Sequence, residues 1–506
     1  MATHLTDWVA FNAGRYGTEI AVESLDSGQQ VTWNQLEDRV ARLSTVLAEL
    51  GIRRGDRVGL IADDDWRTLA LQFACIRSGA IFVPFNWRLT TLEIEVLCKD
   101  AEVSLLVHDD TWQATATQLS EQLDLRLASW SCPDAPRDLD VLMDNAAAHR
   151  PTGRYLSDQT TQMLYTSGTT GLPKGALITL GGMAWHAMNV QHEMAISGPP
   201  ARYLSALPLF HAAGLNAIVN PTLMAGGRIS IMRRFDPPRA AELLGNASHG
   251  FTHFNAAPVM WRMILENSAP DASYAHIDAG MVGGGAIPPD VGAYYSERGL
   301  ELQAGWGATE MGPSMTLMPK SMRVEKSHTV GYPVQHVQIR VVDPVTNEDV
   351  APGGVGEAWV RGPSISPGYW RREADTDPDT QAGWFKCGDA VSIDEDGYVA
   401  LRGRFKDMYK SGGENVFAAE VERVIAAHPD VQDAAVVGMP DEKWGEVGYA
   451  VVVAEEGRTI DESVVIAHVA ERLAKYKVPI RVIVVDDFPR NVTGKIQKNV
   501  LRDQLS

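Results

Sequence analysis

One short segment, YTSGTTGLPKGA at residues 165–176, combines glycines, hydroxyl side chains and a lysine. Glycines let backbone N–H groups approach an anion, hydroxyls donate hydrogen bonds, and Lys174 supplies a positive charge. The segment therefore predicts a loop that holds phosphate groups. It is not a Walker loop, because Gly168 and Gly171 are too close together and Gly175 follows the lysine. The same composition is also typical of surface turns, so other parts of the chain must decide.

Four further segments carry residues that would complement such a loop. They are LPLFHAAGLN at 207–216, GWGATE at 305–310, GWFKCGD at 383–389 and PRNVTGKIQK at 489–498. Each has an ordinary structural explanation by itself, as a core histidine or tryptophan, a solvated acid or a charge in the tail. Together they supply an aromatic face for stacking, an acid for a metal ion, an acid for ribose hydroxyls and cations for phosphate. The combination predicts a site for a nucleoside triphosphate.

The composition limits the classes of protein and of ligand. A chain of 506 residues exceeds what one core usually serves, which predicts two or more domains. The hydrophobic fraction of 45% and the charged fraction of 22% are ordinary for a globular protein. A net charge of −19 argues against nucleic acids and acidic membranes as partners. An anionic ligand would therefore need a local cluster of basic residues.

The sequence also bears on location. No apolar run reaches the roughly 18 residues that a membrane span requires. The first residues, MATHLTDWVAFNAGRYG, lack a basic segment followed by an apolar one and so predict no signal peptide. The four cysteines lie far apart without a C-x-x-C pair, which favours reduced thiols and a cytoplasmic protein. A homodimer remains open.

Helix and strand patterns alternate along the first part of the chain. Residues 32–51 predict a helix, because Thr32 and Gln35 have the spacing of a capping box and Gly51 can end it. Strand patterns at 57–62 and 80–85 flank a second helix pattern at 66–79. This alternation predicts a parallel sheet with both faces covered.

The chain changes character near Lys406. A basic link that contains glycine leads there into an amphipathic helix pattern. Two strand patterns, AAVVGM and YAVVVAE, and a helix pattern over 461–476 follow. We therefore place a domain boundary at Lys406, with residues 1–405 before it and a small α+β domain of residues 406–506 after it.

The six segments YTSGTTGLPKG, LPLFH, GWGATE, GWFKCGD, GRFKDMYKSGGEN and PRNVTGK, in this order, resemble the adenylate-forming superfamily. That superfamily includes acyl-CoA synthetases, nonribosomal adenylation domains and firefly luciferase. The resemblance runs from about residue 30 to residue 500. It implies an α/β fold, with a large N-terminal domain of doubly covered sheets and a small mobile C-terminal domain. It also implies that the protein binds ATP and Mg²⁺.

The resemblance implies a role for each matching residue. The residues from Thr166 to Lys174 would wrap the β- and γ-phosphates of ATP, and Trp306 would stack on adenine. Thr309 would contact the α-phosphate, Glu310 would hold Mg²⁺, and Asp389 would bind both ribose hydroxyls. Lys495 would bridge the attacking carboxylate and the α-phosphate. The implied ATP and CoA residues are Thr166, Ser167, Gly168, Thr169, Thr170, Gly171, Lys174, Gly284, Gly285, Ala286, Trp306, Gly307, Asp389, Arg404, Lys406, Lys410, Gly412 and Gly413.

The C-terminal residues of this set have distinct implied roles. Arg404 would clamp ribose or phosphate, and Lys406 would be the hinge about which the small domain turns. Lys410 would lie one helical turn further on, towards the phosphates. Gly412 and Gly413 would line the channel for the thiol of CoA. Cys387 replaces the threonine that is commoner before the glycine and acid of this motif, which we expect to matter little.

The branch of the superfamily depends on His211. Adenylation domains that take amino acids typically have Asp where this chain has His211, and histidine cannot replace that anion. The SGGEN segment resembles the CoA ligases, so we predict an acid–CoA ligase with catalytic residues Lys495, Thr309, Glu310 and His211. A luciferase-like oxygenase and a non-catalytic nucleotide-binding protein are the alternatives. The latter would be expected to lose Lys495 or Glu310, and this chain keeps both.

The acid substrate is less defined by the sequence. By family position, the acyl pocket would be lined by His211, Leu215, Asn216, Met260, Gly283, Gly305, Met311 and Met315. Glycines and methionines favour an adaptable apolar slot. The LPLFHAAGLN segment resembles ligases for aromatic acids such as ferulate, and it also occurs among ligases for fatty and alicyclic acids. We predict an aromatic or ring-bearing acid, with a medium- or long-chain fatty acid as the alternative.

Overall fold

The computed structural model of the chain forms two compact units. The described residues are 3–132, 137–148, 154–166, 173–372, 383–411, 414–490 and 495–505. The first unit comprises Met1–Ser327, Gly331–Gln338 and Arg361–Phe385. The second comprises His328–Val330, Ile339–Val360 and Lys386–Ser506. The predicted domain boundary at Lys406, between residues 1–405 and 406–506, stays a prediction.

The first helices and strands of the larger unit follow the sequence pattern. In α2 (Trp33–Glu49), the Thr32 hydroxyl accepts the backbone N–H of Gln35, and the Gln35 side chain accepts that of Thr32. Strand β4 (Arg57–Ile61), helix α3 (Trp66–Ser78) and strand β5 (Ile81–Pro84) then follow as predicted. The capping box fixes where α2 begins because it satisfies backbone groups that the helix cannot pair itself.

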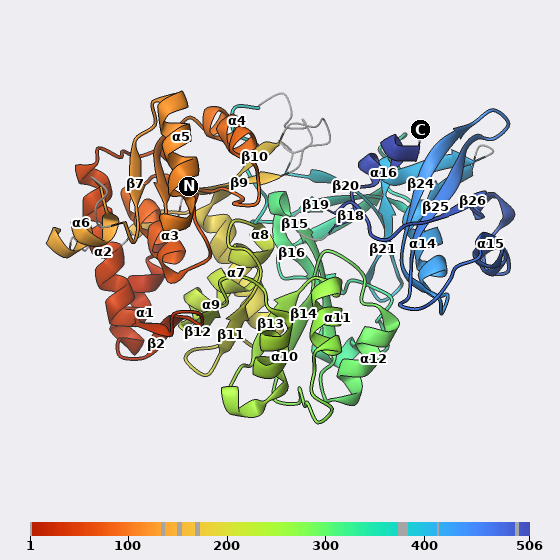
Figure 1. Cartoon of the computed structure of the whole chain (residues 1–506), viewed down its shortest axis with the longest axis horizontal. Helices are drawn as coiled ribbons and strands as arrows, with labels where there is room; N and C mark the ends of the chain where they lie inside the picture. The colour runs from red at the N-terminus through yellow and green to blue at the C-terminus, as the bar shows by residue number, and fades with distance from the viewer. Residues whose placement is uncertain are drawn as a thin grey trace. The chain divides into compact units, whose positions relative to one another are not determined.

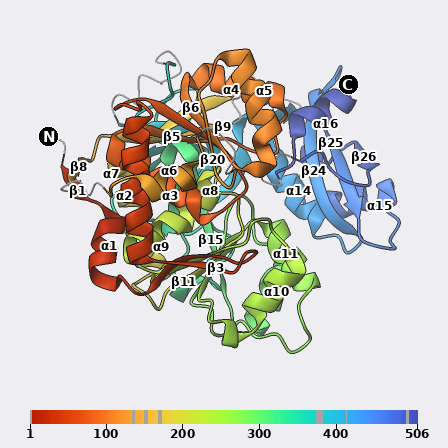
Figure 2. The same ribbon diagram turned by 60° about the vertical axis from the view of Figure 1, so that its left-hand side comes forward.

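A six-stranded sheet in this unit has the order β10-β9-β5-β4-β6-β7. Its other strands are β6 (Val103–His108), β7 (Leu127–Ser129), β9 (Thr160–Thr166) and β10 (Lys174–Thr179). All neighbours are parallel except β9 and β10, which are antiparallel and place Lys174 opposite Thr166. Helices α4 (Thr91–Ala101) and α5 (Gln113–Leu123) cover one face, and α2 and α3 cover the other (Figures 1 and 2). The predicted double cover is confirmed.

A nine-stranded sheet in the same unit carries the GWGATE segment. Its order is β17-β16-β15-β14-β13-β11-β12-β2-β3. The strands are β2 (Ile20–Ser24), β3 (Gln29–Thr32), β11 (Arg202–Ser205), β12 (Arg228–Ile231), β13 (His253–Ala256), β14 (Ala279–Val282), β15 (Leu302–Ala308), β16 (Gly312–Leu317) and β17 (Tyr332–Pro333). Helices α10 (Pro237–Gly245), α11 (Pro258–Glu266) and α12 (Pro289–Glu297) bury Trp261, Tyr274 and Tyr295 against one face. This core includes Val282 at the end of β14 and Leu302 at the start of β15.

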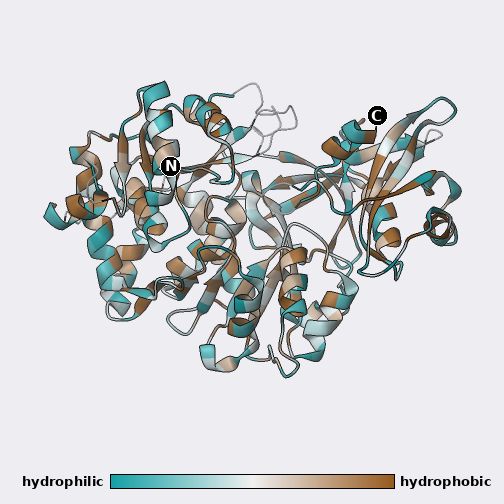
Figure 3. Cartoon of the chain, in the orientation of Figure 1, coloured by the Kyte–Doolittle hydropathy of each residue, from teal (hydrophilic) through white to brown (hydrophobic). Residues whose placement is uncertain are grey.

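The smaller unit contains two further sheets. One has the order β18-β19-β20-β21, and the other has β23-β22-β25-β24 with β26 beside β25. Hydrophobic residues recur along β24 (Val431–Asp441) and β25 (Gly445–Ala454), as Figure 3 shows. Helices α14 (Ala418–Ala426) and α15 (Glu462–Ala470) pack on one face of these strands. Helix α16 (Lys498–Leu505) packs through Leu501 on the other.

Two local predictions for the smaller unit were wrong. The helix predicted over 461–476 ends at Ala470, and the chain then turns so that Leu473 packs on the core. Lys410 does not lie one helical turn after Lys406. Lys406 belongs to a single 3₁₀ turn, and Lys410 lies on strand β22 (Met408–Ser411), because the chain there pairs with β23 (Glu414–Phe417).

Within the described ranges, no helix combines the length and apolarity that crossing a bilayer would take. All four cysteines are free thiols, as the sequence predicted. The cytoplasmic location and the possible homodimer stay predictions.

Candidate functional site

The carboxylate of Glu310 is the centre of a cluster of polar side chains in the larger unit. We call this cluster, which comprises Glu310, Thr166 and Tyr369, the Glu310 group. Strand β15 ends in a 3₁₀ turn, Thr309–Met311, that presents Glu310. The Thr166 hydroxyl at the end of β9 donates to Glu310 Oε1 at 3.1 Å. The Tyr369 hydroxyl donates to the same oxygen at 2.9 Å. The structure therefore brings together the end of the predicted phosphate loop and the predicted metal ligand, and adds a tyrosine that sequence reasoning missed.

Lys174 lies beside the same group. Its ammonium nitrogen is 5.3 Å from the centre of the Tyr369 ring, within the range of a cation–π interaction. Residues Ser167, Gly168, Thr169, Thr170 and Gly171, which the sequence also assigns to phosphate binding, lie outside the described residues.

The glycines of GWGATE are required by close packing. A Cβ at Gly307 would lie 2.6 Å from the backbone of Pro313 on the neighbouring strand. One at Gly305 would lie 2.5 Å from the terminal methyl of Met281. The backbone of β15 therefore runs close to its neighbours at both positions. A role of either glycine towards a ligand stays a prediction.

The predicted adenine site has one buried and one exposed part. Trp306 is only 6% exposed. Thr309, which is predicted to contact the α-phosphate, is 9% exposed. Residues 284–286 form an exposed turn after β14, and Gly284 has a positive φ of 79° that glycine adopts without strain. Stacking of adenine between this turn and Trp306 stays a prediction.

His211 is a neutral side chain at the start of a short helix. It caps Ala212–Gly214, and its Nδ1 accepts the backbone N–H of Ala213 at 3.2 Å. The ring proton is thus on Nε2. Burial lowers the pKa of His211 to about 4, so the ring carries no charge near neutral pH.

The predicted acyl-pocket residues are mostly buried. Leu215 and Asn216 lie on a π-helical turn, Leu215–Val219, and such turns are frequent at functional sites. Met311 and Met315 are fully buried, whereas Met260 is half-buried on α11 and Gly283 is half-buried after β14. Their contact with an acyl group stays a prediction.

The amide of Asn216 belongs to a buried network that the sequence did not reveal. Asn216 Nδ2 donates to Gln162 Oε1 at 2.8 Å, and Asn220 Nδ2 donates to Asn216 Oδ1 at 2.6 Å. Gln72 Nε2 donates to Asn220 at 2.8 Å, and Gln162 Nε2 donates to Gln72 at 3.1 Å. These bonds tie the π-helical turn to β9 and α3, which positions the segment after His211.

Asp64 supports the segment before His211. Its Oδ1 accepts the backbone N–H of Leu209 at 3.1 Å, and the carboxyl is buried. Burial raises the pKa of Asp64 to about 8, and the neighbouring Asp63 and Asp65 add to this effect. Sequence reasoning missed this residue, although three consecutive acids at 63–65 in an apolar context were a visible signal.

The second group of predicted residues lies in the smaller unit. Asp389 on β20 (Phe385–Ile393) is opposite Arg404 on β21 (Val399–Arg404), and Arg404 Nε bonds Asp389 Oδ1 at 2.8 Å. Protein atoms around its ammonium group and the charge of Arg404 lower the pKa of Lys495 to about 8, although much of the residue stays exposed. Asp389 opposes this shift. The structure thus gathers an acid and two cations at this site.

Ion pairs anchor both ends of the Lys495 segment. Arg490 bonds Asp433 on β24 at 2.5 Å, and Lys498 bonds Glu422 on α14 at 2.6 Å. The backbone N–H of Gln497 also donates to the carbonyl of Pro489 at 2.7 Å. The described residues on either side, Arg490 and Lys498, are therefore paired with the core of this unit.

The remaining C-terminal predictions are placed only in part. Lys406 and Lys410 are both exposed. Gly412 and Gly413 lie outside the described residues, between the paired strands β22 and β23. The Cys387 thiol donates to the carbonyl of Ala358 at 3.1 Å, a bond that a threonine hydroxyl could also make.

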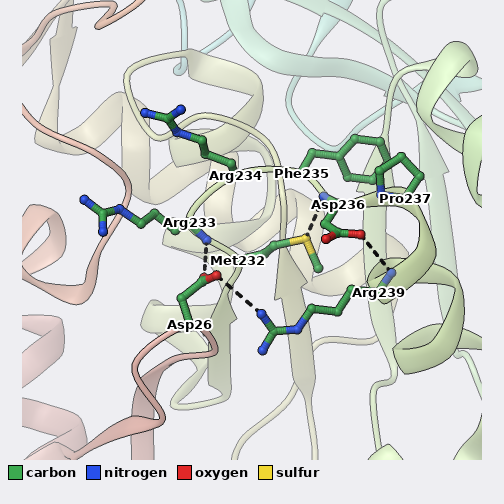
Figure 4. A pocket seen from close by; sticks show the side chains of 8 residues that line it. All are labelled: Asp26, Met232, Arg233, Arg234, Phe235, Asp236, Pro237 and Arg239. Atoms are coloured by element: carbon green, nitrogen blue, oxygen red, sulfur yellow. Dashed lines mark hydrogen bonds and ion pairs between the residues drawn. The ribbon is translucent and has the colours of Figure 1, made fainter. Parts of the chain in front are cut away.

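Figure 4 shows a separate surface pocket of about 540 Å³. Its lining residues are Asp26, Met232, Arg233, Arg234, Phe235, Asp236, Pro237 and Arg239. Arg239 pairs with Asp26 at 3.3 Å, and Arg233 and Arg234 both pair with Asp63. No predicted site residue lines this pocket, and its arginines already face carboxylates, so it is not the candidate site.

Comparison with known families decides the class of enzyme. The AMP-binding enzyme family matches residues 9–370, and the AMP-binding enzyme C-terminal domain matches residues 420–495. The chain belongs to this family. It lies in the acyl-CoA synthetase branch of the adenylate-forming enzymes, as the six motifs predicted.

Similar proteins span almost the whole chain. A feruloyl-CoA synthase from Amycolatopsis is 36% identical over 479 residues and covers 94% of each chain. An indoleacetate–CoA ligase from Aromatoleum aromaticum is 32% identical, over 99% of this chain and 98% of the other. The o-succinylbenzoate CoA synthetase of Bacillus subtilis is 28% identical with a TM-score of 0.87. Its complex with the acyl-adenylate intermediate covers 100% of this chain and 98% of the other, and its complex with ATP and a magnesium ion covers 99% and 100%.

The buried Asp64 generates a prediction about stability. The folded state keeps the Asp64 proton up to about pH 8, whereas the unfolded chain releases it near pH 4. The stability of the wild type should therefore fall as the pH rises across this interval. Asp64→Asn keeps an acceptor for the backbone N–H of Leu209 but cannot ionise. The difference in free energy of unfolding between this variant and the wild type should therefore shift in favour of the variant as the pH rises, by at most about 1.4 kcal/mol per pH unit.

Urea unfolding at pH 5, 6.5 and 8 measures this advantage. Asp38→Asn, which alters an acid that is partly exposed and paired with Arg42, is the control and should show no such gain. A difference between Asp64→Asn and the wild type that is the same at all three pH values would contradict the assignment.

Proposed function

We propose that this protein is an ATP-dependent carboxylic acid–CoA ligase whose acid is aromatic or bears a ring. The carboxylate of the acid attacks the α-phosphorus of ATP. The bond between the α-phosphorus and the oxygen that bridges it to the β-phosphorus breaks, and pyrophosphate leaves. The thiol of CoA then attacks the carbonyl carbon, loses its proton, and releases AMP. The observation that carries the proposal is the Glu310 group. Its carboxylate is hydrogen-bonded to the Thr166 hydroxyl at the start of a glycine-rich segment, an arrangement that suits the binding of a polyphosphate with its metal ion.

The donor set at Glu310 fits Mg²⁺. Carboxylate and hydroxyl oxygens are hard ligands, and Mg²⁺ in ATP enzymes is usually held by one or two protein oxygens with phosphate and water. The described residues contain no cluster of three or more metal-ligating side chains, which suits a metal that arrives with its nucleotide. Bound there, Mg²⁺ would neutralise charge on the phosphates.

Electrostatic repulsion is the main obstacle to the first step. Two unit negative charges about 4 Å apart repel by about 4 kcal/mol at an effective dielectric constant near 20. Lys174 and Lys495 supply positive charge to offset it, and Asp389 and Arg404 orient the ribose. No side chain is required to form a covalent intermediate. These roles are the ones that the resemblance assigns.

Three observations support the class of acid. His211 is neutral, so it cannot pair with the ammonium group of an amino acid substrate. The feruloyl-CoA synthase and the indoleacetate–CoA ligase that resemble this chain are named for ring-bearing acids. An apolar wall that includes the buried Leu215, Met311 and Met315 suits the same class.

The first test of the proposal follows the products and the acid. Purified protein with ATP, Mg²⁺ and CoA should release AMP and pyrophosphate only when a suitable acid is added. Substituted cinnamic and arylacetic acids should give kcat/KM values at least about tenfold above those of medium- and long-chain fatty acids. EDTA should abolish turnover, and excess Mg²⁺ should restore it.

Three outcomes would contradict this reading. Formation of ADP and phosphate would exclude the reaction class. A preference for fatty acids would replace the proposed substrate with the alternative. Oxygen uptake or light emission without CoA would indicate a luciferase-like oxygenase.

A second test separates the two half-reactions. We propose that the small domain turns about Lys406, because Lys495 and the CoA thiol would otherwise compete for one face of the adenylate. Lys495→Ala should lose acid-dependent exchange between ATP and pyrophosphate by at least about a hundredfold, yet still convert supplied acyl-adenylate to acyl-CoA. Lys406→Pro fixes φ and should do the reverse. Equal loss of both half-reactions in both variants would refute the alternation.

The pH dependence of the first half-reaction tests the charge on Lys495. Because its pKa is about 8, Lys495 loses its positive charge as the pH rises through that value. The kcat/KM of adenylate formation should therefore decline above about pH 8. Lys495→Arg keeps its charge, so its profile, normalised to its own maximum, should stay flat to at least pH 9.5. The same alkaline decline in this variant would show that another group titrates.

A further inference from the structure

Tyr369 contacts both the carboxylate of Glu310 and the ammonium group of Lys174. Its hydroxyl donates to Glu310 Oε1 at 2.9 Å, and the face of its ring lies under the Lys174 ammonium group at 5.3 Å. One side chain thus contacts both the predicted metal ligand and the predicted phosphate cation, from a segment about 60 residues further along the chain than Glu310.

The backbone around Tyr369 is fixed to the same elements. The Trp370 N–H donates to the Gly175 carbonyl at 2.8 Å, and the Leu177 N–H donates to the Gly368 carbonyl at 3.0 Å. Tyr369 forms an isolated antiparallel β-bridge with Ala176 of β10. The N–H of Ser366 donates to the carbonyl of Glu310 at 2.8 Å. The segment 366–370 therefore adds an edge to β10 and holds Glu310 by its backbone and its side chain.

The hydroxyl of Thr166 donates to Glu310 Oε1 as well, at 3.1 Å. Two donors on one oxygen restrict rotation of the carboxylate and leave Oε2 as the oxygen that receives neither bond. Hydrogen bonds that orient a ligating carboxylate typically raise metal affinity by ten- to a hundredfold. A carboxylate held in one orientation also loses less conformational freedom when it binds a metal.

We propose that Tyr369 is a positioning residue that presets Glu310 for the metal ion and holds Lys174 for the phosphates. The inference rests on the proposed function, since it takes Glu310 as the ligand of the ATP-bound metal. Tyr369 itself does not contact the reacting atoms. The two halves of its role belong to different parts of the side chain, the hydroxyl and the ring.

Two substitutions separate the hydroxyl from the ring. Tyr369→Phe removes only the hydroxyl and keeps the ring under Lys174, so it should weaken metal binding by about tenfold. Tyr369→Leu removes both, so it should also raise the KM for ATP at saturating Mg²⁺ by at least about threefold. Excess Mg²⁺ should restore the kcat of Tyr369→Phe to within about twofold of the wild type.

Mn²⁺ provides a readout that does not depend on turnover. Its binding to the full-length protein with a non-hydrolysable ATP analogue is titrated by electron paramagnetic resonance. Tyr165→Phe is the matched control, because Tyr165 donates to a different carboxylate, Asp100 Oδ2, at 2.8 Å. It should leave the Mn²⁺ affinity unchanged within twofold. In a Glu310→Gln background, Tyr369→Phe should cause no further loss.

The outcomes distinguish this inference from the proposed function. An unchanged Mn²⁺ affinity in Tyr369→Phe, or an equal loss in Tyr165→Phe, would overturn the role of Tyr369 while the ligase assignment stands. A wild type that binds no Mn²⁺ with the nucleotide, or shows no acid-dependent exchange between ATP and pyrophosphate, would overturn both. A tenfold loss that is confined to Tyr369→Phe and absent without Glu310 would support the role.

Discussion

The chemistry that we propose is constrained by the meeting of two anions, a carboxylate and a polyphosphate. The chain carries a net charge of −19, so the average surface opposes such a ligand. The positive charge must be concentrated locally, and the fold does this in two places. Lys174 lies at the start of β10 against the ring of Tyr369, and Arg404 and Lys495 lie near Asp389 in the smaller unit.

Each of these charges is held by an element that is itself anchored. The antiparallel pairing of β9 with β10 puts Thr166 opposite Lys174, so the two ends of the predicted phosphate loop are fixed. In the smaller unit, Arg490 and Lys498, which precede and follow Lys495 in the sequence, form ion pairs with Asp433 and Glu422. Precise placement of charges matters because preorganised groups require little rearrangement during the reaction.

The region around His211 depends on buried polar groups of a different kind. Asp64 holds the backbone before it, and the amide network through Asn216 holds the turn after it. Buried polar groups are tolerated when their hydrogen bonds are satisfied, and a satisfied network specifies one arrangement. The neutral state of His211 follows from the same burial.

The elements of the first sheet and the family of this protein could be predicted from its sequence. The capping box at Thr32, the alternation of strands and helices, and the six ordered motifs predicted the elements of the first sheet and the family, because these signals are local. Tertiary structure alone decided what long-range packing controls. It paired Tyr369 with Glu310, placed Asp64 under Leu209, put Lys410 on a strand and ended α15 at Ala470. The contacts of Tyr369 and Asp64 could not be read from spacing, since their partners are distant in sequence and meet only when the sheets form. Lys410 is on a strand because β22 pairs with the nearby β23, a hairpin that the sequence analysis did not recognise.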